Sequence, residues 1–65
     1  MILKELLEVL NANVYFHLFK EKHIGRFDKY DIGISTYILD YVKEINIDDE
    51  VLEIYLESKG EEWWN

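Results

Sequence analysis

Residues 41–57 read YVKEINIDDEVLEIYLE, and the fold depends on whether this stretch forms a helix or a β-hairpin. In a helix, Asp48 would be the N-cap and Gly60 would follow the last turn as the C′ residue. In a hairpin, residues 41–47 and 52–57 would be two strands that flank an acidic reversal. Both alternatives have local signals in their favour.

The register of the two strands distinguishes these alternatives. The expected pairs are Ile47–Leu52, Ile45–Ile54 and Lys43–Leu56 on one face, and Asn46–Glu53, Glu44–Tyr55 and Val42–Glu57 on the other. The first face is then almost entirely apolar. A two-residue period that holds across both strands favours the hairpin over the helix.

The first third of the chain predicts a helix followed by a strand. Residues 2–10 (ILKELLEVL) place apolar side chains along one helical stripe and consist mostly of strong helix formers. Residues 14–20 (VYFHLFK) are rich in β-branched and aromatic side chains, which favours a strand. Because both faces of this strand are partly apolar, we expect a helix to cover one face and another part of the protein to cover the other.

Two further elements follow. Residues 24–28 (IGRFD) continue as a second strand after a polar reversal, and Gly25 indicates a bulge or a close backbone approach. Further along, Ser35 or Thr36 is expected to cap one helical turn over residues 37–41.

These elements together predict an α+β domain of residues 1–60. An N-terminal helix would pack on a small, mostly antiparallel sheet of three to four strands, of which the last two form a C-terminal β-hairpin. Residues 61–65 would follow as an acidic tail with two tryptophans. Neighbouring side chains of an extended chain point to opposite sides, so one tryptophan could close the core while the other anchors a partner.

The composition bears on which kinds of site to expect. The 65-residue chain has no cysteine, which excludes disulfides and thiolate metal ligands. His17 and His23 lie six residues apart, which is not a helical ligand spacing, and we expect neither a metal site nor a cofactor. His17 should be half-buried and hydrogen-bonded, and His23 exposed. We expect a soluble, cytoplasmic protein, because no apolar run is long enough to span a membrane and no signal-peptide pattern is present.

The charge of the chain is distributed unevenly. Residues 1–39 carry five acidic and five basic side chains, whereas residues 40–65 carry nine acidic and two basic ones, so the whole net charge of −7 lies in the second segment. Such a field repels nucleic acid and membranes and attracts basic surfaces. The same charge would also keep a small domain soluble.

Four segments follow one another in a particular layout: LKELLEVL at 3–10, HIGRFD at 23–28, ILDYVKEINI at 38–47 and, after an acidic turn, LEIYLE at 52–57. This layout resembles a type of small protein that is common in phages and prophages of low-GC Gram-positive bacteria. The resemblance implies an α+β fold with a hairpin. It also implies a function as an inhibitor of host defence, anti-CRISPR proteins among them, in the host cytoplasm.

We expect the protein to act by binding rather than as an enzyme. The sequence has no phosphate-binding glycine loop, no nucleophile–base motif and no metal signature. In the hairpin, carboxylates would spread over a rigid face and imitate the phosphates that a basic groove binds. The predicted partner is a host protein with a basic nucleic-acid-binding surface, not nucleic acid itself and not a membrane. The predicted recognition residues are Glu44, Asp48, Asp49, Glu50, Glu53, Tyr55, Glu57, Glu61, Glu62, Trp63 and Trp64.

Two alternatives remain open. The first is a homo-oligomer, such as a homodimer, that acts by assembly or by holding a small molecule between subunits. Its adhesive surface would be the strand at residues 14–19 together with the terminal tryptophans. The second is an accessory module whose sheet edge pairs with a strand of a partner protein.

Overall fold

The structure is a computed structural model that describes residues 1–57. A four-stranded mixed sheet forms its centre. The elements are α1 (Leu3–Val9), β1 (Phe16–Lys20), β2 (Lys22–Phe27), the 3-10 helix η1 (Ile32–Ile34), β3 (Val42–Asp48) and β4 (Val51–Leu56). The strand order is β2-β1-β4-β3, in which β1 and β4 run parallel and the two outer pairs run antiparallel. The predicted α+β fold with its C-terminal hairpin is confirmed, and the alternative of a helix that begins at Asp48 is wrong.

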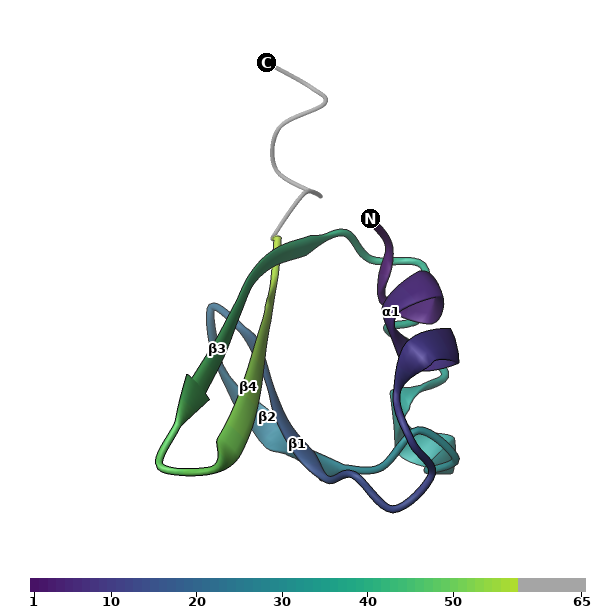
Figure 1. Cartoon of the computed structure of the whole chain (residues 1–65). Coiled ribbons are helices and arrows are strands. Elements are labelled where there is room, and N and C mark those ends of the chain that lie inside the picture. The colour runs from purple at the N-terminus through teal and green to yellow at the C-terminus, as the bar shows by residue number, and fades with distance from the viewer. Residues whose placement is uncertain (58–65) are drawn as a thin grey trace.

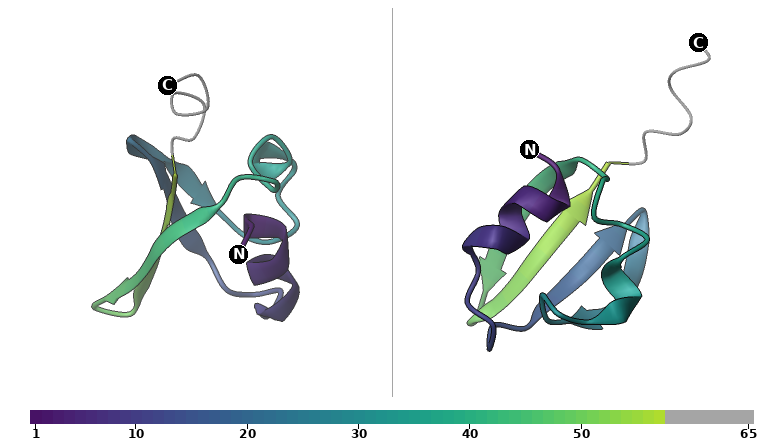
Figure 2. Two further views of the ribbon diagram at one scale, coloured as in Figure 1. Left: turned by 90° about the horizontal axis from the view of Figure 1, so that it is seen from above. Right: turned by 90° about the vertical axis from the view of Figure 1, so that its right-hand side faces the viewer.

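The elements outside the sheet lie on one of its faces. Figures 1 and 2 show α1 and the segment of residues 30–41 on the same side of the four strands. The opposite face is not covered by any part of residues 1–57. The helix expected on one face of β1 is therefore present, and the cover expected on the other face stays a prediction, since residues 1–57 do not supply it.

Helix α1 is fixed at its start by backbone contacts with the segment that precedes β3. The amide of Leu3 donates to the carbonyl of Asp40 at 2.9 Å, and the amide of Lys4 donates to Ile38 at 2.8 Å. The carboxylate of Glu5 accepts from the amide of Ile2 at 3.0 Å. These bonds satisfy amides that have no partner within a helix, and they hold a helix of only seven residues against the sheet.

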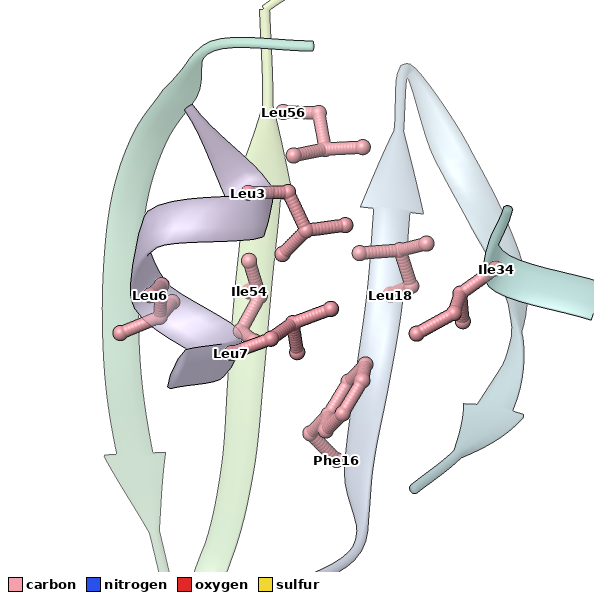
Figure 3. Close-up of a cluster of buried hydrophobic side chains, with 8 residues drawn as sticks. All are labelled: Leu3, Leu6, Leu7, Phe16, Leu18, Ile34, Ile54 and Leu56. Carbon is pink, nitrogen blue, oxygen red and sulfur yellow. The ribbon is translucent and has the colours of Figure 1, made fainter. Parts of the chain in front are cut away.

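The hydrophobic core fills the space between α1 and the two central strands. Its buried side chains come from the helix, the two central strands and the 3-10 helix. They are Leu3, Leu6 and Leu7 of α1, Phe16 and Leu18 of β1, Ile54 and Leu56 of β4, and Ile34 of η1 (Figure 3). The predicted strand is confirmed in β1, in which Phe16 and Leu18 are buried on the core face and His17 and Phe19 on the other face are half-buried.

The hairpin of β3 and β4 follows the predicted register over most of its length. Ile47 lies opposite Leu52, Ile45 opposite Ile54, Asn46 opposite Glu53 and Glu44 opposite Tyr55. The last pairs were predicted wrongly, because the register shifts between Val42 and Glu44 and places Val42, not Lys43, opposite Leu56. This bulge at Lys43 turns an apolar side chain towards the core and leaves the lysine exposed.

Both hairpin turns contain residues with positive φ that are not glycine. Asp49 and Glu50 have φ values of 53° and 69°, as the two central residues of a type I′ turn require. Glu21 has φ 71° and is the only residue between β1 and β2, so the predicted polar reversal is a single residue long. A side chain at positive φ costs roughly 1–2 kcal/mol per residue.

Strand β2 has the irregularity that Gly25 predicts. The register with β1 shifts between Leu18 and Phe19, so Ile24 is inserted as a bulge. A Cβ atom at Gly25 would lie 3.1 Å from the Phe27 ring, which confirms the close approach.

The short helical turn lies earlier than predicted. Asp31, not Ser35 or Thr36, caps η1 by accepting a 2.9 Å hydrogen bond from the amide of Gly33. Lys20 and Asp40 form a 3.0 Å ion pair that ties the end of this segment to β1.

Candidate functional site

The face of the sheet away from α1 carries side chains from all four strands. The register places them in two rows that run from β2 through β1 and β4 to β3. One row is His23, Phe19, Tyr55 and Glu44, and the other is Arg26, His17, Glu53 and Asn46. We call these eight residues the open face, because α1 and the segment of residues 30–41 lie on the other side of the sheet (Figure 1).

Two aromatic rings form the apolar centre of the open face. Phe19 and Tyr55 stack with their ring centroids 4.5 Å apart and their planes inclined by 14°. The ring of His23 lies 5.1 Å from that of Phe19 on the other side. Stacked rings on neighbouring strands resist rotation, so the polar groups around them are held in defined positions.

Tyr55 has carboxylates of both β3 and β4 as neighbours, because Glu44 lies opposite it and Glu53 lies two residues before it on β4. This hydroxyl donates a 3.0 Å hydrogen bond to Glu53. The pKa of Tyr55 lies above its usual value, first because Glu53 accepts this bond, then because of burial, and then because of the charges of Glu53, Glu44 and Asp48. Asn46 in turn donates a 2.9 Å hydrogen bond to Glu44. The structure therefore brings three of the predicted carboxylates together around the predicted aromatic residue.

The other predicted acidic residues of the hairpin extend this charge. Asp49 and Glu50 are exposed in the turn, and Glu57 is half-buried directly after β4. Within residues 1–57, no basic side chain forms an ion pair with the acidic residues of the hairpin. These carboxylates can therefore accept hydrogen bonds from the lysine or arginine side chains of another molecule.

Four predicted recognition residues, Glu61, Glu62, Trp63 and Trp64, lie outside the described residues. Their roles in binding or in core closure stay predictions.

The histidines form a pair that was not predicted from the sequence. His17 Nδ1 lies 2.9 Å from His23 Nε2, and the ring centroids are 5.1 Å apart. The expectation that His17 is half-buried and hydrogen-bonded is confirmed, as is the exposure of His23. A helical spacing was the wrong test for this pair, because the two residues lie on adjacent antiparallel strands.

A hollow of about 340 Å³ adjoins the histidine pair at the end of the sheet near the β3–β4 turn. It is lined by Tyr15, His17, Arg26, Glu50 and Val51, and the Arg26 guanidinium lies 4.5 Å from the centre of the Tyr15 ring. Its volume is at the lower end of the roughly 300–1,000 Å³ that ligand sites occupy.

No group of three or more His, Asp or Glu side chains among residues 1–57 converges as ligands of a metal ion. No helix in the same part of the chain has the length and the apolar composition to cross a membrane. Comparison of the chain with protein-family models, curated proteins and solved structures gives no match.

Proposed function

We propose that the protein is a non-catalytic inhibitor that binds a partner protein and occupies its basic, nucleic-acid-binding surface. The observation that carries this proposal is the placement of two carboxylates around Tyr55 from two strands, since Glu44 lies opposite Tyr55 on β3 and Glu53 accepts the hydrogen bond of its hydroxyl on β4. Strands hold these carboxylates in fixed relative positions, so a partner meets a pattern of charge rather than a mobile acidic tail.

The electrostatics of the open face support a protein partner with a basic surface. The carboxylates of β3 and β4 have no ion-pair partner within residues 1–57, and the chain as a whole carries a net charge of −7. A surface that normally binds phosphates offers Lys and Arg side chains, and these can pair with the carboxylates instead. Tyr55 and Phe19 add aromatic surface of the kind that is enriched at protein interfaces.

The resemblance to phage-encoded proteins suggests the class of partner. A bacterial defence protein that handles nucleic acid, such as a CRISPR effector in the host cytoplasm, has the basic channel that this face would occupy. Binding of this kind would block the access of nucleic acid to the channel without any chemical step.

The experiment is a capture from bacterial lysate with the wild-type chain and with the triple variant Glu44→Gln, Glu53→Gln and Glu57→Gln. We expect the wild type to retain a nucleic-acid-binding protein at low salt and to release it at high salt, because screening weakens the charge pairs. The triple variant should retain much less of the same protein. With the purified partner, its own nucleic acid should compete with the wild-type chain for binding.

A charge-matched pair of variants controls for the overall change of charge. Glu44→Lys changes the charge on the open face, and Glu8→Lys makes the same change on the exposed side of α1. Only the first should weaken binding. The proposal would be wrong if the triple variant bound as tightly as the wild type with the same salt dependence. It would also be wrong if the partner bound nucleic acid and this chain at the same time.

One observation favours the homo-oligomer as a second candidate. On the apolar face of the hairpin, Ile45 and Ile47 of the edge strand β3 are 42% and 76% exposed. A second copy that pairs along β3 would bury these side chains. Sedimentation of the full chain separates the candidates, since a monomer at micromolar concentration speaks against the oligomer and an oligomer that withstands high salt supports it.

A further inference from the structure

The imidazoles of His17 and His23 face each other across adjacent strands, with Nδ1 of the first 2.9 Å from Nε2 of the second. From the geometry we infer that they form a chelating site on the open face for a divalent transition-metal ion, Cu²⁺ or Ni²⁺, that favours ligands at right angles. The two ligands lie on β1 and β2, whereas the proposed inhibition depends on the carboxylates of β3 and β4, so failure of the metal site would leave the proposed inhibition untouched.

The separation of the two ring nitrogens carries the inference. They lie 2.9 Å apart, and a metal ion about 2.05 Å from each would therefore see them at an angle of about 90°. This is the angle between neighbouring ligands in square-planar, tetragonal and octahedral sites, which Cu²⁺ and Ni²⁺ adopt. A tetrahedral ion such as Zn²⁺ would require a separation of about 3.3 Å.

The two rings carry protons in a way that permits a metal ion to replace the hydrogen bond between them. A neutral imidazole carries one proton, on either of its two nitrogens. In the hydrogen-bonded pair, one of the facing nitrogens donates to the other. When a metal ion replaces the shared hydrogen, each ring keeps its one proton on its outer nitrogen, His17 Nε2 and His23 Nδ1. The site therefore forms by a change of tautomer and a rotation of both rings that turns the facing nitrogens towards the ion, without loss of a proton.

The strands hold the two ligands in place before any ion binds. β1 is paired on both sides, and the single turn residue Glu21 fixes the register between the two histidines. The ring of Phe19 lies beside His23, with the two ring centroids 5.1 Å apart. Ligands that are positioned in advance lose little conformational entropy on binding, so two of them suffice for chelation.

The surroundings suit a surface site that is completed by water. His23 is exposed, so solvent can reach the remaining coordination positions. The groups that face His17 from the neighbouring strands are Arg26 on β2 and Glu53 on β4, and these opposite charges offset each other. Arg26 is also directed onto the Tyr15 ring. The net charge of −7 favours the approach of a cation.

The test measures the affinity of the full 65-residue chain for CuCl₂ and for NiCl₂ by calorimetry. We expect one ion per chain, and for Cu²⁺ an electron paramagnetic resonance spectrum with hyperfine coupling to two nitrogens. Joining two ligands in one site raises affinity over a single ligand by about 10²–10⁴. His17→Gln and His23→Gln should therefore each weaken binding by about 100-fold or more, and a smaller loss in either variant overturns the chelate.

Two further measurements make the test independent of the stability of these variants. Lys22→Gln changes an exposed residue next to His23 on the same strand, and it should leave the affinity unchanged. In the wild-type chain, Cu²⁺ below one equivalent should broaden the nuclear magnetic resonance signals of the two imidazoles before those of Asp48–Glu50. Broadening that begins at the acidic turn overturns the site, because the ion would then be held by carboxylates.

Discussion

Ile54 and Ile45 face each other across β3 and β4, yet their surroundings differ. Ile54 is 0% exposed on a central strand, between Leu18 of β1 and Ile45 of β3. Ile45 is 42% exposed on the edge strand. Replacing each in turn by alanine removes the same atoms from opposite positions, so the pair of variants tests the strand order and the position of the core.

The expected costs follow from burial. Ile54→Ala should lower the free energy of unfolding by about 4 kcal/mol, in the upper part of the ~2–5 kcal/mol range for such truncations, because no part of the side chain reaches solvent. Full burial of an isoleucine side chain stabilises by about 1.5–3 kcal/mol, so Ile45→Ala should cost only roughly 1 kcal/mol. A domain of this length has a total stability of about 3–10 kcal/mol, so Ile54→Ala leaves a marginal or unfolded protein. Ile54→Val keeps the protein folded and should cost about 1 kcal/mol.

The assay is urea unfolding followed by far-ultraviolet circular dichroism, with thermal unfolding as a second measure. Ile54→Val should lower Tm by about 4–8 °C. The dependence of stability on urea should be the same in all folded variants, since they expose the same surface on unfolding. If Ile45→Ala costs as much as Ile54→Ala, the reasoning is refuted, because Ile45 would then be buried as well. Repeating the measurement at ten-fold higher protein concentration would show whether a second copy buries it.

Two further predictions concern the hairpin. Because the pKa of Tyr55 is raised, its phenolate forms above the usual tyrosine range, and the folded state should lose stability as the pH rises beyond about 10. Glu53→Gln should move this ionisation back towards lower pH in ultraviolet difference spectra against Tyr55→Phe, and an unchanged titration would contradict the assigned cause. Glu50→Gly should raise the free energy of unfolding by about 0.5–1 kcal/mol, because glycine adopts positive φ without strain. Glu50→Gln removes the charge and keeps the strain, so an equal gain in that variant would show that charge rather than φ is responsible.

The sequence predicts the hairpin well because its information is local. Alternation along two nearby strands determines which residues share a face, and this established the pairs Ile45–Ile54 and Glu44–Tyr55. The bulge at Lys43 was not predicted, since a strict two-residue period has no place for an inserted residue. A signal was present, because Val42 is apolar and Lys43 is not, and the shift places the apolar side chain opposite Leu56.

The sequence does not predict the histidine pair in the same way. A turn at Glu21 alone, with Lys20 opposite Lys22, would have placed His17 and His23 on one face of adjacent strands. His23 then lies opposite Phe19, and Phe19 shares a face with His17 two residues earlier. Glutamate rarely adopts positive φ, so nothing in its identity indicates such a tight reversal. The parallel pairing of β1 with β4 is a contact between segments far apart in the chain, which local periodicity does not encode.

This parallel pairing converts the charge asymmetry along the chain into one across the sheet. It places the electrically balanced N-terminal segment, with Arg26 and the histidines on β2 and β1, beside the acidic segment on β4 and β3. The open face therefore runs from a cationic and imidazole-bearing edge to an acidic edge, with the Phe19–Tyr55 stack between them. A uniformly basic partner surface matches only the acidic half, and Arg26 repels it from the other half. Such a partner should therefore dock along the β3–β4 hairpin rather than across the whole face, which places Glu44 near the centre of the contact and leaves the histidine pair at its margin.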